Sequence, residues 1–300
     1  MEPKIQNPGD SNRITREYLD SLRLEMRHLD NVLPSTDLTL YGRAFGTPVM
    51  TAAFSHLAAF HFHDDGMAEV ARAAQAENAV NWAGMGNEEE LERIVATGAA
   101  TVKIIKPYRD NERIFRKIDY ARRAGAIAVG MDIDHSFDRA GNYDKVFDDE
   151  MRPKTVSDLK AFVAAAGETP FVVKGVLSVR DAEKCLEAGV RGIVVSHHHG
   201  IMEYAVPPLM ILPRIAEAVG GKMPIFVDCG IATGYDAFKA LALGATAVCV
   251  GRAVLGPLKE SGAEGAAKYI RQMTRELAGV MARTGCADLS SIDRSVIWGG

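Results

Sequence analysis

Charged residues stand where apolar runs end. The run P-F-V-V closes on Lys174, and a lysine in such a place is costly to bury unless an anion or a ligand pairs with it. Asp132 and Asp134 follow another apolar run, and Asp228 closes a third. We therefore interpret Lys174 as a residue that pairs with an anion or a bound ligand.

Three consecutive histidines, His197 to His199, lie in the segment S-H-H-H-G. With Asp132, Asp134 and the pair His61 and His63 they invite interpretation as a metal site. Consecutive residues that leave a strand point in different directions, so at most two of the three reach one ion, and no H-x-x-x-H spacing supplies the rest. We expect no metal site here.

His61 and His63 have a simpler interpretation. They precede an amphipathic segment, and two aspartates lie between them and its start. We expect an ordinary loop that caps the following helix through Asp64 or Asp65, because a carboxylate accepts from the free N–H groups of a first helical turn.

Glycines after two late apolar runs indicate a phosphate site. The segment D-C-G-I-A-T-G begins at Asp228, and V-G-R-A begins at Val250. Backbone N–H groups at strand-to-helix turns point toward a phosphate, and an arginine neutralises it. We expect Gly230, Gly251 and Arg252 to bind that group.

The segments that carry these residues alternate between two patterns. Short β-branched runs predict strands, and apolar residues at i, i+3 and i+4 predict helices between them. The expected strands are Pro48–Ala53, Ala79–Ala83, Thr101–Ile105, Ala126–Met131, Pro170–Lys174, Gly192–Ser196, Pro224–Asp228 and Ala247–Val250. The expected helices are Gly66–Ala76, Glu88–Ala96, Asn111–Ala124, Val156–Ala166, Val179–Ala188, Pro208–Val219, Tyr235–Leu243 and Ala263–Ala282.

Eight strand-then-helix units favour an α/β fold of the (β/α)8 barrel type, because both faces of parallel barrel strands are covered and the strands read as apolar throughout. A doubly wound open sheet is the alternative. Residues 1–45, with a helical pattern over Arg16–Asn31, form an extension that we expect at the bottom or side of the barrel. Residues 46–300 form the barrel, and its site is expected at the C-terminal ends of the strands.

The longest connection follows the fourth strand. It covers Asp134–Lys154, is rich in charge and holds two glycines. A long connection at the C-terminal end of a strand is either an active-site loop or lid, or a solvated insertion. Both interpretations stay open.

Composition excludes several functions. The 300 residues are 47% hydrophobic and 25% charged, as in soluble globular proteins, and the net charge is −4. Without a positive field, nucleic acid is not an expected partner. The polar start and the absence of a long apolar run predict a cytoplasmic protein without a membrane span.

From Phe171 to Ile297 the chain resembles the FMN-dependent α-hydroxy-acid oxidases and dehydrogenases, the glycolate and lactate oxidase family. The segments VVKGVLSVRDAEKCLEAGVRGIVVSHHHG, PIFVDCGIATGYDAFKALALGATAVCVGRAVL and TRELAGVMARTGCADLSSIDRS carry the resemblance. A weaker likeness reaches back to about Asn31. It implies FMN as cofactor, a small-molecule substrate and a homo-oligomer, a tetramer in this family.

The resemblance also implies residue roles. Lys174 matches the lysine that stabilises reduced flavin, His198 the catalytic base, and Asp134 the carboxylate that orients it. Asp228, Gly230, Gly251 and Arg252 match the phosphate site. The further flavin contacts fall on Ala53, Ser55, Gly84, Lys103, Asp132 and Ser196.

Several family residues are replaced. Ile201 occupies the position of the arginine that clamps the substrate carboxylate, and Ala232 occupies that of the arginine in D-G-G-x-R. The N-terminal extension that carries an active-site tyrosine in the family is shortened or absent. Lys103 and Ile105 replace the glutamine and the tyrosine of the family's Q-x-Y segment, and Asp132 replaces a threonine. Losing the clamp removes charge-assisted bonds worth about 1.5–3 kcal/mol each.

A different substrate contact is therefore expected. The candidate residues are Lys103, Lys106, Arg139, His199, Ile201 and Met202. The leading hypothesis is an FMN-dependent oxidoreductase that removes a hydride from a hydroxyl-bearing carbon of a 2-hydroxy-acid-like substrate. The alternatives are an FMN-dependent isomerase and a scaffold that binds flavin or phosphate without dehydrogenase activity.

Overall fold

A computed structural model describes residues 7–57 and 65–298. His61, His63 and Asp64 lie outside the described residues. Asp65 occupies the N-cap position of the following helix, but its side chain makes no capping hydrogen bond. Its backbone ψ of 45° is not the extended value of a capping residue, and the carboxylate faces Arg93 at 3.6 Å instead. The expected cap through Asp65 is wrong.

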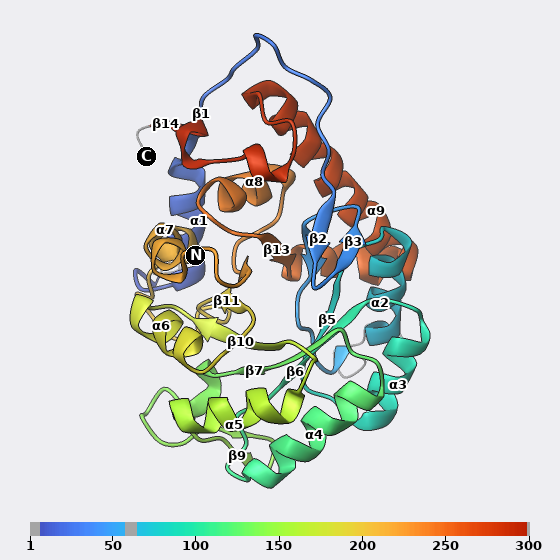
Figure 1. Cartoon of the computed structure of the whole chain (residues 1–300), viewed down its shortest axis with the longest axis vertical. Coiled ribbons are helices and arrows are strands. Elements are labelled where there is room, and N and C mark those ends of the chain that lie inside the picture. Colours follow the sequence, from blue (N-terminus) through green and yellow to red (C-terminus); the bar gives the residue numbers. More distant parts are fainter. Residues whose placement is uncertain (1–6, 58–64, 299–300) are drawn as a thin grey trace, which may run out of the picture.

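Eight parallel strands form the barrel shown in Figure 1. They are β4 (Val49–Thr51), β5 (Asn81–Ala83), β6 (Thr101–Ile105), β7 (Ala128–Asp132), β10 (Phe171–Val176), β11 (Ile193–Val195), β12 (Ile225–Val227) and β13 (Ala247–Val250). The hydrogen-bonded order runs β4-β13-β12-β11-β10-β7-β6-β5. A parallel bridge between Phe54 and Ala83 and a bond from Thr51 N to Val80 O (3.2 Å) close the ring. The (β/α)8 barrel is confirmed, and the open sheet is excluded.

A helix follows each strand and packs outside the barrel (Figure 1). They are α2 (Gly66–Ala76), α3 (Glu88–Ala96), α4 (Asn111–Arg123), α5 (Val156–Ala166), α6 (Val179–Glu187), α7 (Pro208–Val219), α8 (Gly234–Ala242) and α9 (Arg252–Thr284). Side chains of Asn87, Asp110, Thr155, Ser178 and Thr233 accept from first-turn N–H groups and fix five of these starts. Side-chain caps therefore define the first residue of five of the eight barrel helices.

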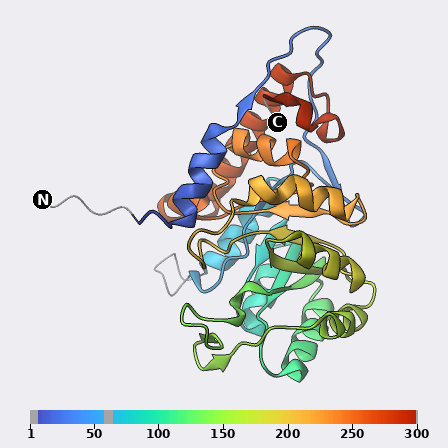
Figure 2. The same ribbon diagram turned by 90° about the vertical axis from the view of Figure 1, so that its left-hand side faces the viewer.

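The N-terminal segment covers both the side and the bottom of the barrel. Helix α1 (Ser11–Ser21) lies beside α7 (Figure 2), and β1 (Arg23–Leu24) pairs with β14 (Ile297–Trp298). The hairpin of β2 (Leu38–Leu40) and β3 (Arg43–Phe45) packs its apolar side chains on those inside the barrel. Tyr41, at its turn, donates to Arg191 O (2.9 Å) just before β11, at the N-terminal ends of the strands. The hairpin thus lies at the bottom of the barrel, one of the two positions expected for this extension.

The extent of α1 differs from the expectation. The helix starts five residues before Arg16 because Asp10 accepts from Asn12 N, and it ends at Ser21 because Arg23 and Leu24 enter a strand. Its first turn thereby reaches the C-terminal ends of the barrel strands, which the sequence did not predict. Among the described residues, no helix combines the length and the apolar character needed to cross a bilayer.

Candidate active site

A cavity of about 410 Å³ opens at the C-terminal ends of the strands. Its walls come from strand β10, from the turns after β4, β11, β12 and β13, and from the first half of α1. The lining residues are Asn12, Arg16, Ala52, Ala53, Phe54, Lys174, His198, His199, Asp228, Cys229, Gly230, Ile231, Ala232, Gly251, Arg252 and Ala253. The expected residues Ala53, Lys174, His198, His199, Asp228, Gly230, Gly251 and Arg252 therefore meet in one cavity.

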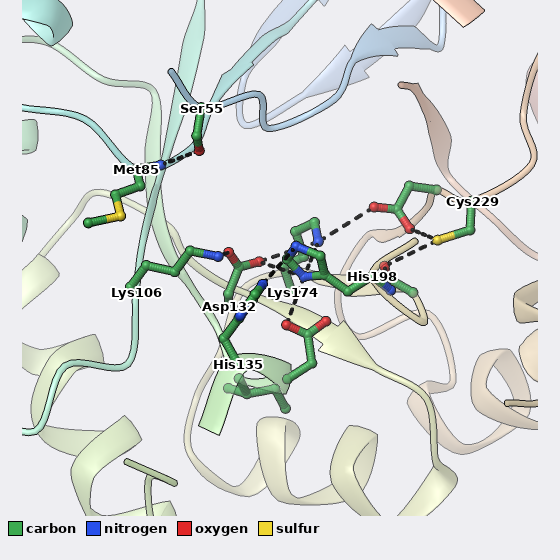
Figure 3. Close-up of polar contacts among 12 residues, drawn as sticks. Ser55, Met85, Lys106, Asp132, His135, Lys174, His198 and Cys229 are labelled. Atoms are coloured by element: carbon green, nitrogen blue, oxygen red, sulfur yellow. Dashed lines mark hydrogen bonds and ion pairs between the residues drawn. The ribbon is translucent and has the colours of Figure 1, made fainter. Parts of the chain in front are cut away.

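Lys174 is buried at the base of this cavity, among carboxylates (Figure 3). Its Nζ lies 3.3 Å from Asp132 Oδ1 and 3.6 Å from Asp228 Oδ2. Burial alone would lower the pKa of Lys174, but Asp132, Asp228 and Asp134 outweigh it and hold that pKa well above its ordinary value. Lys174 is therefore a fixed positive charge, as the sequence interpretation required.

His198 projects into the cavity from the turn after β11. Its Nδ1 lies 2.9 Å from Asp134 Oδ1 and 3.2 Å from Lys174 Nζ. Its backbone φ of +45° is uncommon for a non-glycine residue, and its N–H donates to Ser196 Oγ (3.0 Å). The turn thus aims the ring at Asp134, and a carboxylate on Nδ1 leaves Nε2 to take a proton.

The other two histidines point elsewhere. His197 is buried and its Nε2 lies 2.8 Å from Thr15 Oγ1 on α1. His199 is exposed, and its Nδ1 lies 3.0 Å from Asn12 Oδ1. Of the three, only His198 faces the carboxylates around Lys174.

A second histidine beside His198 was missed at the sequence level. His135 follows β7 in the 3-10 turn Asp134–Ser136, and its Nε2 lies 3.1 Å from His198 Nε2. Asp144 holds the other side of the ring, with Oδ2 3.0 Å from Nδ1. The one sequence signal was its place directly after Asp134. The connection 134–154 therefore contributes three side chains to the site and is not a plain solvated insertion.

Asp132 joins two lysines at the end of β7. Its Oδ2 accepts from Lys106 Nζ at 2.7 Å, while Oδ1 faces Lys174. Burial would raise the pKa of Asp132, but Lys174, Lys106 and His198 hold it well below its ordinary value. The carboxylate is charged, so it already balances the positive charge of Lys106 within the site.

The remaining expected flavin contacts group at the end of β5. Ser55 Oγ accepts from Met85 N (2.8 Å; Figure 3), and Lys103 Nζ donates to Gly84 O. Burial lowers the pKa of Lys103 to about 8. A β-carbon at Gly84 would lie 2.7 Å from Ala53 O, so glycine is required for the close approach of these two turns.

Two arginines lie at the opposite end of the cavity, near the glycine turns. Arg252 donates to Asn12 Oδ1 at 2.8 Å. Arg16, from α1, donates to Gly230 O (3.1 Å) and pairs with Asp236 (2.9 Å) beside Ala232. A cation from α1 thus lies where the resemblance indicated a missing arginine.

The substrate candidates are not brought together. Lys106 is paired with Asp132, and Arg139 and Met202 are exposed. Ile201 is half-buried; neither it nor Met202 lines the cavity among the described residues. Only His199 does so.

The cavity fits FMN on its own chemistry. Ala52, Ala53 and Gly251 leave one wall without bulky side chains, which suits a flat ring, and Lys174 supplies a buried cation at one end. Gly230, Gly251 and Arg252 offer backbone N–H groups and a guanidinium for a phosphate at the other. When bound there, FMN would supply a hydride acceptor.

Comparison with known proteins identifies the family. The sequence matches the FMN-dependent dehydrogenase family over residues 6–154 and 138–299. It is 30% identical over 320 residues to a 4-hydroxymandelate oxidase of Amycolatopsis orientalis, covering 95% of this chain and 88% of that protein. Identity to a peroxisomal (S)-2-hydroxyacid oxidase of Arabidopsis thaliana is 30% over 289 residues, 85% of this chain and 79% of that protein.

Solved structures show the same fold. A mandelate oxidase variant with the monooxide FMN adduct superposes with a TM-score of 0.85 at 29% identity, covering 95% of this chain and 90% of that one. Mandelate oxidase with 3,3-difluoro-2-hydroxy-3-phenylpropionic acid gives a TM-score of 0.86 at 28% identity, covering 96% and 90%.

Proposed function

The chain belongs to the FMN-dependent dehydrogenase family, and on this premise we propose that it oxidises a 2-hydroxy acid, or a related substrate with a hydroxyl-bearing carbon, by hydride transfer to FMN. The observation that carries the proposal is the geometry of His198: its Nδ1 lies 2.9 Å from Asp134 Oδ1, beside the buried cation Lys174. This is the arrangement of a general base with an orienting carboxylate.

His198 takes the hydroxyl proton at Nε2. Hydride loss from a carbinol carbon leaves a developing positive charge unless a base removes that proton. Asp134, ionised and hydrogen-bonded to Nδ1, fixes the ring tautomer and stabilises the imidazolium that forms.

Lys174 holds a positive charge beside the flavin. Its carboxylate partners keep it protonated, so it stabilises negative charge that develops on the ring during hydride transfer. The flavin contacts that we assign to Ala53, Ser55, Gly84, Lys103, Asp132 and Ser196 surround the same region. Gly230, Gly251 and Arg252 bind the phosphate, and Asp228, whose Oδ2 lies 3.6 Å from Lys174 Nζ, is a further cofactor contact.

Next to its hydroxyl-bearing carbon, the substrate carries either a carboxylate or a neutral group such as an amide. Ile201 has no charge that could pair with a carboxylate, and the positive charge of Lys106 is balanced by Asp132. A carboxylate substrate must therefore compete with Asp132 for Lys106 or use a histidine such as His199. A 2-hydroxy amide needs no such cation.

Anaerobic flavin bleaching tests the proposal. The purified protein is saturated with FMN and mixed with glycolate, lactate, mandelate, 4-hydroxymandelate and the matching 2-hydroxy amides. Loss of the oxidised flavin absorbance with one of these, together with formation of the oxo product, is the expected result. A flavin-loaded protein that none of them reduces would contradict the function.

Two wider proposals follow the family resemblance. We propose a cytoplasmic location, although two relatives are named as peroxisomal, and a homo-oligomer, as a tetramer. Cell fractionation and light scattering on the purified protein test them.

A further inference from the structure

The side chain of Asn12 bridges two parts of the site. Its Oδ1 accepts from Arg252 Nη2 at 2.8 Å and lies 3.0 Å from His199 Nδ1, and its Nδ2 donates to His199 O at 3.0 Å. His199 directly follows His198 in residues 197–200, which we call the histidine turn. One residue of α1 therefore contacts both the arginine expected at the phosphate and the neighbour of the proposed base.

The amide of Asn12 fits these partners in one orientation. An amide oxygen accepts and an amide nitrogen donates two hydrogens. Arg252 can only donate, whereas the carbonyl of His199 and the carboxylate of Asp10, 3.3 Å from Nδ2, accept. Exchanging the oxygen and the nitrogen would thus oppose like groups on both sides. A methyl group or a carboxylate at this position would lose one side of the bridge or both.

The histidine turn has a backbone that needs support. The φ angles of His198, His199 and Gly200 are +45°, +59° and +78°, and positive values are uncommon for residues with a β-carbon. Ser196 Oγ accepts from His198 N inside the turn (3.0 Å), and Asn12 adds its two contacts to His199 from outside. A β-carbon at Gly200 would lie 2.8 Å from Asn12 Nδ2. The turn is therefore shaped to receive this amide.

Arg252 gains from the same contact. It is exposed at the first residue of α9, where a long side chain has rotamer freedom to lose when it binds a ligand. A guanidinium has five N–H donors, so Asn12 can hold Nη2 while other donors bind phosphate oxygens. An arginine that is already in place binds its ligand with a smaller loss of entropy.

We propose that Asn12 is a positioning residue, which joins Arg252 to the histidine turn so that a phosphate group bound by Arg252 also holds the turn of His198 in place. This rests on the proposed function. The coupling is reciprocal: a fixed turn strengthens the binding of the phosphate, and the bound phosphate fixes the turn. The bridge therefore contributes to a preference for FMN over riboflavin, which lacks the phosphate.

Comparison of FMN with riboflavin isolates the phosphate contribution. Quenching of flavin fluorescence on titration gives both dissociation constants, and their ratio is the preference for FMN. Asn12→Ala should lower this preference about 3- to 10-fold, the scale of one hydrogen bond. Asn12→Asp should lower it further, because its carboxylate competes with the phosphate for Arg252. A general loss of structure would weaken both flavins equally and leave the ratio unchanged.

The matched control is Ser11→Ala. Ser11 also docks α1 on this face of the barrel, through Met202 O (2.6 Å) and Ala205 N (3.0 Å), but its hydrogen bonds do not involve Arg252. We expect the native preference for FMN in this variant. An equal fall in Ser11→Ala and Asn12→Ala would overturn the proposal, because the ratio would then report only the docking of α1.

A double variant shows whether Asn12 acts through Arg252. Once Arg252→Ala has removed the guanidinium, adding Asn12→Ala should change the preference by less than about twofold. Losses that multiply in the double variant would overturn the proposal, as would a native preference in both Asn12 variants. No substrate enters these measurements, so their outcome does not depend on which reaction the protein catalyses.

Inorganic phosphate tests the effect on the histidine turn. The riboflavin-loaded protein is mixed anaerobically with the hydroxy substrates, with phosphate or with chloride at the same ionic strength. Phosphate should accelerate flavin reduction about fivefold or more in the native protein and not in Asn12→Ala. Equal acceleration in both, or none in a native protein that is reduced, would overturn the proposal. Absence of any reduction in the native protein, with the binding results as expected, would count against the proposed function alone.

Discussion

Gly175 leaves the space that the Asp134 carboxylate occupies. A β-carbon at position 175 would lie 2.4 Å from Asp134 Oδ2, and the backbone there has a φ of +92°. The glycine of the V-K-G-V segment therefore has two reasons to be glycine: the left-handed backbone and the close approach of Asp134. It allows Lys174 and Asp134 to meet the same histidine.

Gly175→Ala should destabilise the protein and misplace Asp134. The positive φ alone costs about 1–2 kcal/mol for a residue with a β-carbon, and the steric overlap adds to it. Gly98→Ala is the matched control, because Gly98 also has a positive φ (+82°) but its nearest neighbour would lie 3.9 Å from the new carbon. Urea unfolding should show a larger loss at position 175, and flavin reduction should fall only there.

An equal loss of stability in both variants, with native flavin reduction in Gly175→Ala, would contradict this account. Asp134 would then have room to move without losing His198. Both measurements are made at the same FMN load, so that cofactor binding does not mask the difference.

Local sequence patterns predicted the barrel because each strand and helix carries its own signal. Apolar β-branched runs and capping residues act within a few positions, and the predicted helices start and end within two residues of the observed ones, apart from α1 and the start of α9. The prediction began this helix at Ala263 because the helical signal breaks at Gly262, where the backbone of the observed α9 leaves the helical conformation and kinks.

The strand pattern by itself predicted the site residues at or next to strand ends, while His198 and Asp134 came from the family resemblance. Lys174, Asp132 and Asp228 lie at such ends, so topology alone brings them together. The pairing of His135 with Asp144 depends on how the connection after β7 folds back, and the approach of Asn12 and Arg16 depends on the docking of α1. Neither contact has a local pattern that could have revealed it.

His198→Ala should retain FMN and lose flavin reduction. General-base catalysis contributes about 10²- to 10⁴-fold, so the anaerobic rate of substrate-dependent bleaching should fall by that factor. His197→Ala and His199→Ala should be milder, since these rings contact α1 rather than Asp134. If His199→Ala is the inactive variant, or if all three reduce flavin at the native rate, His198 is not the base.

Arg252→Ala should weaken FMN binding. A charge-assisted contact to phosphate is worth about 1.5–3 kcal/mol, which corresponds to roughly a 10- to 150-fold rise in the dissociation constant. Arg139→Ala is the control, because Arg139 is exposed and the proposed phosphate site does not include it. Quenching of FMN fluorescence on titration measures both constants, and an unchanged constant for Arg252→Ala would place the phosphate elsewhere.

Lys103 should make stability depend on pH in the alkaline range. Its pKa in the folded protein is about 8, against an ordinary value of 10.5, because the ammonium is buried. Between these values the unfolded chain binds more protons than the folded one, so the free energy of unfolding rises with pH from about 8 to about 10.5. Below pH 8 the folded protein bears the full cost of the buried charge.

Lys103→Met should therefore stabilise the protein at pH 7 and lose that advantage toward pH 10. A depression of this size corresponds to about 3 kcal/mol, and the lost hydrogen bond to Gly84 O offsets about 1 kcal/mol of it. Urea unfolding at both pH values measures the difference, with Lys160→Met, at an exposed surface pair with Glu187, as the control. A stability gain of equal size at pH 7 and pH 10 would contradict this account. Lys103 would then be packed as a neutral amine or would reach water. Only a lysine that is both charged and buried below pH 8 makes the gain disappear as the pH rises and its proton leaves.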